Sequence, residues 1–145
     1  MSIFTCELVS DDQLLAEALK VRREVFVNER GISEEEEYDG YDEQALHVVI
    51  KDDRDRVIGT ARVRFLDNHR AKIERMAVLK AFRRQGVGRL IIAFLGELLA
   101  NRQIEYIILH AQLSAADFYK SCGFEEQGEI FEEAGISHIQ MWKRL

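Results

Sequence analysis

The stretch Lys80-Ala-Phe-Arg-Arg-Gln-Gly-Val-Gly-Arg-Leu90 lies between an apolar, strand-like run and a strongly amphipathic helix. The run covers Ile73 to Val78, and the helix is predicted from Gly88 to about Asn101. The first N–H groups of a helix have no partner inside it, and the helix dipole adds partial positive charge there. Glycines at such a turn let a phosphate approach the backbone. We therefore expect a phosphate-bearing ligand at residues 83–89, the alternative being a helix start with solvated arginines.

Length and composition indicate one globular domain over residues 1–145, with 47% apolar and 32% charged residues. No apolar run approaches the ~18 residues of a membrane span, and the N-terminus lacks the pattern of a signal peptide. The cysteines Cys6 and Cys122 do not make a disulfide framework. We expect a cytoplasmic protein without a membrane partner. The net charge of −6 argues against nucleic-acid binding.

The first half of the chain predicts a strand, a helix and a hairpin. Ile3–Val9 has the pattern of a strand, and Ser10–Gln13 matches a capping box ahead of an apolar helical stripe. That helix fades near residues 28–31. The segments Ala45–Lys51 and Val57–Phe65 alternate as half-buried strands do, which predicts an antiparallel pair.

The second half predicts a strand–helix–strand unit followed by a helix and two closing strands. Strand 73–78 continues the antiparallel order, whereas strand 105–111 is apolar on both faces, as in a parallel pair. Ser114 is a suitable N-cap for a helix over residues 115–122, and Gly123 a suitable residue after its end. The closing strands are expected at residues 124–131 and 138–143.

Two motifs at this spacing resemble those of the GNAT superfamily of N-acetyltransferases. Arg83-x-x-Gly86-x-Gly88 resembles the family's acetyl-CoA pyrophosphate motif, and Ala116-Asp-Phe-Tyr-Lys-Ser-Cys-Gly-Phe124 its second signature. The resemblance covers essentially the whole chain. Val25–Arg30 and Gly135–Ile139 are similar to the small bacterial ElaA/YjcF-type branch.

The resemblance implies an α/β (α+β) fold with a mixed sheet of six or seven strands and about four helices. The sheet is expected to splay between strands 73–78 and 105–111, and acetyl-CoA, the cosubstrate, is expected in the gap. The pantetheine arm would pair with the backbone of Met76, Ala77 and Val78. The pyrophosphate would lie on the turn, whose residues are Arg83, Arg84, Gln85, Gly86, Val87, Gly88 and Arg89.

Acetyl transfer to an amine needs a base, a donor to the oxyanion and an acid for the thiolate. The resemblance implies a backbone N–H near Met76–Ala77 as the donor and Tyr119 as the acid, unless Tyr119 only packs beside Phe118. Glu74 is a candidate base. It is expected to share a strand face with Met76 and Val78, where desolvation would raise its pKa. The alternative is a cross-strand ion pair with Arg62 or Arg64.

Glu29 and His138 are further candidates for contact with the acceptor. The segment Glu34–Glu43 is either an acidic rim that attracts a cationic amine or a solvated loop. The histidines at 47, 69 and 110 have no metal-ligand spacing, so no metal is expected.

The leading hypothesis is an acetyl-CoA-dependent N-acetyltransferase in which a primary amine attacks the thioester directly. The acceptor is a small-molecule or protein amine, and the family resemblance is compatible with a homodimer. A non-catalytic acyl-CoA sensor of the same fold is the alternative. A Rossmann nucleotide binder is disfavoured because the full Gly-x-Gly-x-x-Gly pattern is absent.

Overall fold

The computed structural model describes residues 3–145, and its strands form one seven-stranded sheet in the order β1-β2-β3-β4-β5-β7-β6. The strands are β1 Thr5–Leu8, β2 Leu46–Lys51, β3 Val57–Phe65, β4 Arg70–Val78, β5 Tyr106–Gln112, β6 Glu125–Glu133 and β7 Ile136–Arg144. The helices are α1 Asp12–Arg22, α2 Glu34–Glu37, α3 Val87–Asn101 and α4 Ala116–Ser121. A π-helix, η1 Arg23–Glu29, continues α1, and the short 3₁₀ turns are η2 Asp42–Gln44, η3 Lys80–Phe82 and η4 Leu113–Ala115. The mixed sheet and its helices confirm the predicted fold class.

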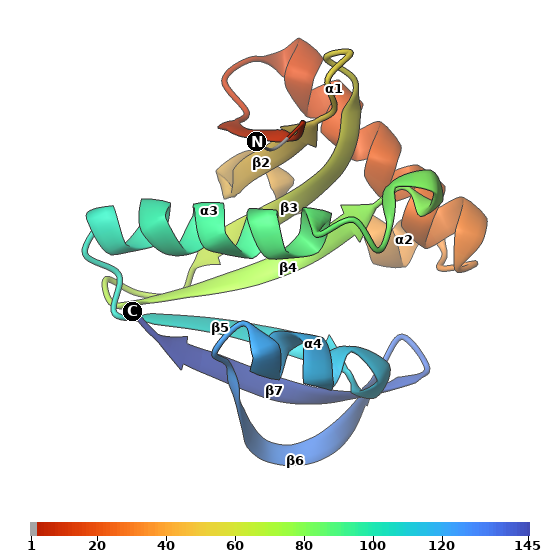
Figure 1. Ribbon diagram of the computed structural model, residues 1–145. Coiled ribbons are helices and arrows are strands. Elements are labelled where there is room, and N and C mark those ends of the chain that lie inside the picture. The colour runs from red at the N-terminus through yellow and green to blue at the C-terminus, as the bar shows by residue number, and fades with distance from the viewer. Residues whose placement is uncertain (1–2) are drawn as a thin grey trace.

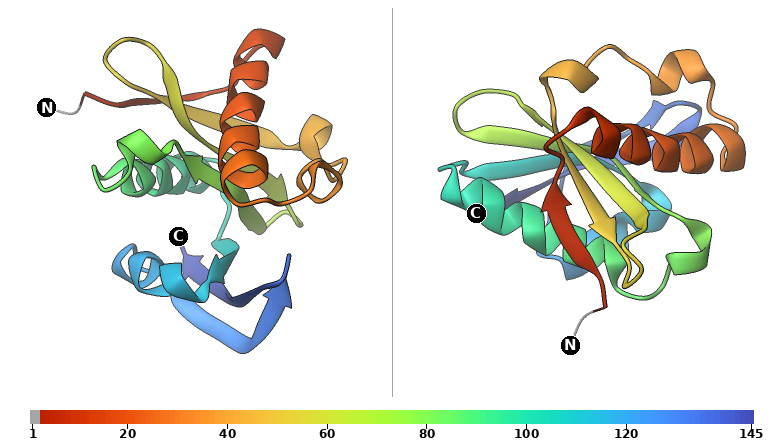
Figure 2. Two further views of the ribbon diagram at one scale, coloured as in Figure 1. Left: turned by 90° about the vertical axis from the view of Figure 1, so that its right-hand side faces the viewer. Right: turned by 90° about the horizontal axis from the view of Figure 1, so that it is seen from above.

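Helices cover both faces of the sheet's first half, as the view from above shows (Figure 2). On one face α3 buries Ile91, Leu95 and Leu99 against the strands. On the other face α1 and η1 bury Val21 and Val25. None of the helices described over residues 3–145 is long and apolar enough to cross a membrane.

The sheet is antiparallel except between β4 and β5, which run parallel. Their pairing is short, because it joins only Arg70–Ile73 to Tyr106–Leu109. Beyond these residues the two strands diverge toward their carboxyl ends (Figure 1). The predicted splay between β4 and β5 is therefore confirmed, and Met76–Val78 has no partner on β5.

A β-bulge lies in β4 at the start of the splay. Arg62 pairs with Glu74 and Thr60 pairs with Ala77, so two residues of β4, Arg75 and Met76, lie opposite one residue of β3. Arg75 adopts a left-handed conformation with φ of 52°.

The extra residue reverses the alternation of side chains along β4. Before the bulge Ile73 faces the core under α3, and after it Met76 and Val78 face that core. Glu74 therefore points to the opposite face, toward α2. The expectation that Glu74 shares a face with Met76 and Val78 was wrong, because a pattern read with a strict period of two does not include the bulge.

Two helix starts also differ from expectation. Asp11 rather than Ser10 caps α1, and its Oδ1 accepts from the Leu14 N–H at 2.7 Å. Ser114 lies inside η4, so α4 begins at Ala116 without a side-chain cap. The extra 3₁₀ turn leads the chain from β5 into α4.

The end of α4 is as predicted. Gly123 has φ of 94°, and its N–H donates to the Lys120 carbonyl at 3.0 Å. The Phe124 N–H donates to the Tyr119 carbonyl at 3.0 Å, and the two rings pack edge to face. This is the hydrogen-bond pattern of a Schellman motif, and it holds Tyr119 against the sheet.

Gly59 of β3 marks a close approach that tests the packing of this sheet. A Cβ there would lie 2.7 Å from Ile50 Cγ2 and 3.2 Å from the Ala77 carbonyl. Gly59→Ala should therefore lower the free energy of unfolding by about 1–3 kcal/mol in urea denaturation. The matched control is Gly96→Ala in α3, where a Cβ meets nothing within 4 Å. The control should raise stability by about 0.5–1 kcal/mol, and equal effects in both variants would contradict this packing.

Candidate active site

A pocket of about 440 Å³ lies at the N-terminus of α3. Its lining residues are Val78, Arg83, Arg84, Gly86, Val87, Gly88, Arg89 and Phe118. Gly86 is the N-cap of α3, with φ of 79°. In the first hydrogen bond of the helix, the Leu90 N–H donates to the Gly86 carbonyl. The N–H groups of Val87, Gly88 and Arg89 therefore have no partner within the helix, which suits an anion.

The three arginines of this loop have different surroundings. Arg83 forms a bidentate pair with Glu29 at 2.6 and 2.7 Å, and its Nε donates to the Val78 carbonyl at 2.9 Å. Arg89 donates to Ser121 Oγ at 2.8 Å. Arg84 has no ion pair with any residue in the described range 3–145. The positive charge that is free to meet an anion therefore comes from Arg84 and Arg89, whereas Arg83 ties the loop to η1.

The position of Glu29 differs from the expectation that it contacts an acceptor. Arg83, in the loop before α3, donates hydrogen bonds to the Glu29 carboxylate. This hydrogen bonding lowers the pKa of Glu29. Glu29 does not line the second pocket described next. Sequence order alone did not show that the end of η1 packs against the loop after β4.

The second pocket, of about 650 Å³, opens between the diverging ends of β4 and β5. Its walls come from η1, α2, the middle strands, the start of α4 and the β6–β7 turn. The polar side chains of its lining include Arg64, Lys72, Glu74, Arg75, His110, Tyr119 and His138. Phe118 borders the first pocket, at the N-terminus of α3, and Tyr119 borders the second pocket, so α4 forms the boundary between them.

Tyr119 lies at this boundary with its ring packed on Phe118 and Phe124. Burial raises the pKa of its phenol to about 12, and the nearby Cys122 acts in the same direction. The phenol therefore stays protonated across the neutral range and is a hydrogen-bond donor. The structure brings it to the gap where the sequence placed it.

Glu74 forms the ion pair that was the alternative to its role as a base. Arg62 and Arg64 donate to its carboxylate, and Lys72 Nζ lies 3.1 Å away. Burial by itself would raise its pKa, but the two arginines and Lys72 outweigh that effect and lower the pKa to about 2. The expected raised pKa was wrong, and such a carboxylate is a poor proton acceptor near neutral pH.

His138 lies on β7 in the wall of the second pocket and stacks on Phe131. Its Nδ1 is 2.7 Å from the Ile136 carbonyl, which can only accept a hydrogen bond. Nδ1 therefore carries the proton, and in the neutral ring Nε2 keeps a lone pair. A contact with an acceptor remains a prediction for this residue.

The acidic segment Glu34–Glu43 is neither a simple rim nor a solvated loop. Glu37 is fully buried and pairs with arginines, as do Asp39 and Asp42. Glu35, Glu36, Glu37 and Asp39 all line the second pocket. Residues 3–145 hold no cluster of three or more His, Cys, Asp or Glu side chains placed to bind a metal ion.

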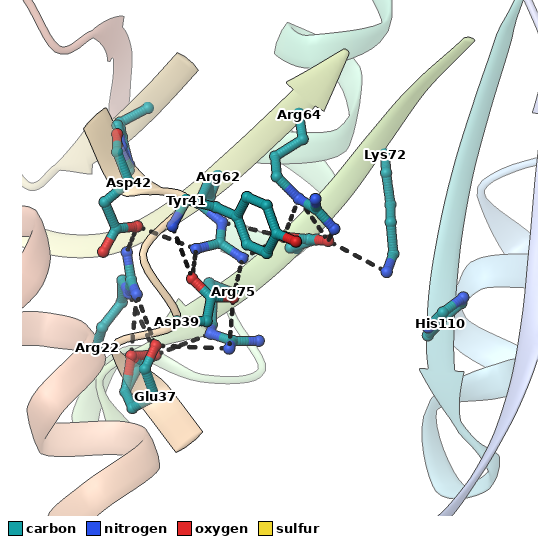
Figure 3. Close-up of polar contacts among 12 residues, drawn as sticks. Arg22, Glu37, Asp39, Tyr41, Asp42, Arg62, Arg64, Lys72, Arg75 and His110 are labelled. Carbon is teal, nitrogen blue, oxygen red and sulfur yellow. Dashed lines mark hydrogen bonds and ion pairs between the residues drawn. The ribbon is translucent and has the colours of Figure 1, made fainter. Parts of the chain in front are cut away.

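Sequence reasoning missed several residues that line the second pocket. Lys72 and His110 lie on facing sides of the gap between β4 and β5 (Figure 3). His110 bonds to Glu133 and Gln140, both at 3.3 Å. His110 is a polar side chain within a segment predicted to be a strand, and Lys72 directly precedes another such segment, which was a usable signal. The bulge in β4 brings Arg75 to the wall of the second pocket. It could not be recognised from the alternation of apolar and polar residues in the sequence.

The splayed mixed sheet and the two adjoining pockets have the arrangement expected of the family that the two motifs resemble, and comparison with known proteins identifies that family. A family profile described as "Acetyltransferase (GNAT) domain" matches residues 10–145. The chain therefore belongs to the GNAT acetyltransferase family, as its motifs predicted.

Several bacterial proteins are similar to this chain in sequence and in structure. It is 37% identical over 137 residues to YjcF of Bacillus subtilis, named as an uncharacterized N-acetyltransferase, with 94% of this chain and 96% of YjcF covered. A crystal structure from Lactobacillus plantarum matches with a TM-score of 0.93 and 29% identity, covering 99% of each chain. The structure of Escherichia coli ElaA matches with a TM-score of 0.85 and 26% identity, covering 97% of this chain and 99% of ElaA.

Gly86 offers a test of the prediction that the first pocket binds the pyrophosphate of acetyl-CoA. Gly86→Asp places a negative charge where the anion is expected, so affinity for coenzyme A should fall more than about tenfold in calorimetry. Gly86→Asn is the matched control, since it has the same size and tolerates the same left-handed backbone. Equal affinities for the Asp and Asn variants would contradict a phosphate site here.

The lowered pKa of Glu74 predicts how stability depends on pH. Because its pKa is depressed in the folded protein, its contribution is present above about pH 4.5 and is lost as the pH falls toward 2. Glu74→Gln should cost about 3 kcal/mol at pH 7 and show a shallower loss of stability below pH 4.5. Glu7→Gln, at the exposed Lys51 pair, is the control and should follow the wild-type profile. A Glu74→Gln curve parallel to wild type would contradict the assignment.

Proposed function

We propose that the protein is an acetyl-CoA-dependent N-acetyltransferase that acts on a primary amine. The observation that carries the proposal is the meeting of the two pockets at α4. One pocket offers N–H groups and arginines to a phosphate, and the other offers space for an acceptor. Tyr119 lies where the two adjoin. A structure of a GNAT family acetyltransferase from Elizabethkingia anophelis, which shares the fold with a TM-score of 0.66, holds acetyl-CoA.

The free edge of β4 is suited to the pantetheine arm. Met76, Ala77 and Val78 follow the last β4–β5 pair, so their backbone faces the gap without a partner on β5. An extended amide-containing arm can pair with such an edge as an added strand does. A backbone N–H of Met76 or Ala77 would then donate to the thioester oxygen as negative charge develops there.

In the proposed reaction the acceptor nitrogen attacks the thioester carbonyl carbon directly. A C–N bond forms, the carbonyl oxygen takes the charge, and the C–S bond breaks as the carbonyl reforms. The amine is neutral when it attacks. Its nitrogen becomes positively charged in the tetrahedral intermediate and passes a proton to a base or to water, and Tyr119 gives its proton to the leaving sulfur. The phenol then regains a proton from solvent.

The acceptor is proposed to enter through the second pocket. His138 Nε2 is proposed to accept a hydrogen bond from the amine, because Nδ1 is already committed to the Ile136 carbonyl. Glu74 is not proposed as the base. Its carboxylate is held by three cations, so proton removal falls to water or to a histidine of the pocket.

A thiol-release assay with acetyl-CoA and a broad panel of amines tests the proposal. The panel should include amino acids, polyamines, aminoglycosides and peptides with free N-termini or lysines. Acceptor-dependent release of coenzyme A, with the acetylated amine found by mass spectrometry, is the expected result. Tight acetyl-CoA binding with no turnover over the whole panel would favour the sensor instead.

Tyr119→Phe tests the proposed acid. A thiol titrates near ~8.5, well below this phenol, so Tyr119 acts on the developing thiolate in the transition state more than on bound substrate. The single-turnover rate should fall at least about tenfold, while acetyl-CoA affinity changes by no more than a few-fold. Tyr106→Phe, in the Trp142 stack at the far end of β5, is the control and should keep the wild-type rate. If Tyr119→Phe kept the wild-type single-turnover rate, Tyr119 would contribute only to packing and not to catalysis.

A further inference from the structure

Six charged side chains form a closed ring in which positive and negative groups alternate (Figure 3). In order around the ring they are Arg75, Glu37, Arg22, Asp42, Arg62 and Asp39, which returns to Arg75. Each member therefore has two neighbours of opposite charge.

The contacts that close the ring are short. Arg22 lies 2.9 Å from Glu37 and 2.6 Å from Asp42. Arg62 Nη1 lies 3.1 Å from Asp42 and 2.8 Å from Asp39. The side chains of Arg22, Glu37 and Arg62 are almost fully buried. Opening the ring at one member would leave buried charges short of a partner, which is costly.

Arg75 closes the ring from the bulge of β4. Its Nε lies 3.1 Å from Glu37 Oε1, an ion pair without hydrogen-bond geometry, and its Nη2 lies 3.2 Å from Asp39 Oδ2. Nη2 also donates to the Glu36 carbonyl at 3.1 Å. The ring thus links the end of α1, the α2–η2 segment and β3 to the one residue of β4 with a left-handed backbone.

The ring depends on the bulged register of β4. In a regular strand Arg75 would share a face with Ile73 and enter the apolar core under α3. The bulge turns it instead to the carboxylates on the other side. Glu74, the preceding residue, is held by Arg62, which is itself a ring member. The contacts of two consecutive side chains, Glu74 and Arg75, therefore hold the backbone that leads into Met76–Val78.

We propose that this charge ring positions the backbone of Met76–Val78 for the pantetheine arm and the oxyanion. Its members would then act on the acetyl-CoA side as positioning residues, through the backbone of β4, although Glu37, Asp39 and Arg75 also line the second pocket. The inference rests on the proposed function, because that function assigns the pantetheine arm to this edge. Asp39 is the most accessible carboxylate of the ring, with a side chain 26% exposed. The ring is therefore best perturbed at Asp39.

The test compares Asp39→Asn, which removes one ring charge at constant size, with Asp39→Glu, which keeps it. Asp39→Asn should shift the backbone amide resonances of Met76, Ala77 and Val78 while those of Gly86–Arg89 stay in place. Its affinity for acetyl-CoA should fall about fivefold, but its affinity for the nucleotide fragment of coenzyme A without the pantetheine arm should stay within about twofold. Asp39→Glu should recover part of the loss.

Glu7→Gln, which removes an exposed ion pair at the far edge of the sheet, controls for general loss of charge pairs and should change neither affinity. Unmoved Met76–Val78 resonances in folded Asp39→Asn would overturn the proposal, as would an equal loss of affinity for both ligands. If the wild-type protein bound neither ligand, the proposed function would fall, whereas the amide shifts would still decide whether the ring sets this backbone.

Discussion

An extra residue in β4 places both Arg75 and Met76 opposite a single position of β3, and every later side chain of the strand changes face. This bulge coincides with the end of β4–β5 pairing. Before the bulge, β4 pairs with β3 on one side and with β5 on the other. After it, the strand presents apolar side chains to α3 and an unpaired backbone edge to the gap. Both candidate pockets border the segment that follows.

Buried charge replaces apolar packing on the α2 side of this region. A small helix of four glutamates cannot bury an apolar face, so α2 is held by Glu37, which meets Arg22 and Arg75. Because every buried charge in the ring has opposite neighbours, the arrangement favours one geometry over many similar ones. Despite its burial, the pKa of Glu74 is lowered by Arg64, Arg62 and Lys72, of which only Arg62 belongs to the ring, and this removes Glu74 from acid–base chemistry near neutral pH.

The loop before α3 differs from the second pocket in how it is built. The anion site proposed at the loop depends on backbone geometry at Gly86 and on the free N–H groups of a helix end, which are properties of adjacent residues. The second pocket is assembled from segments far apart in the chain, including η1, α2, β4 and the β6–β7 turn. Under the proposed function, variation in those segments would change the acceptor while the proposed acetyl-CoA loop stays the same.

The sequence by itself determined the features that depend on near neighbours. These were the strand and helix order, the glycine turn before α3, the end of α4 at Gly123 and the family membership carried by two motifs. Only the tertiary structure decided which charges meet. Glu74 faces three cations, Glu29 pairs with Arg83, and the acidic segment closes a ring with Arg75, because a one-residue bulge and long-range packing choose a side chain's partners. Neither a one-residue bulge nor a long-range contact produces a periodic pattern of apolar and polar residues in the sequence.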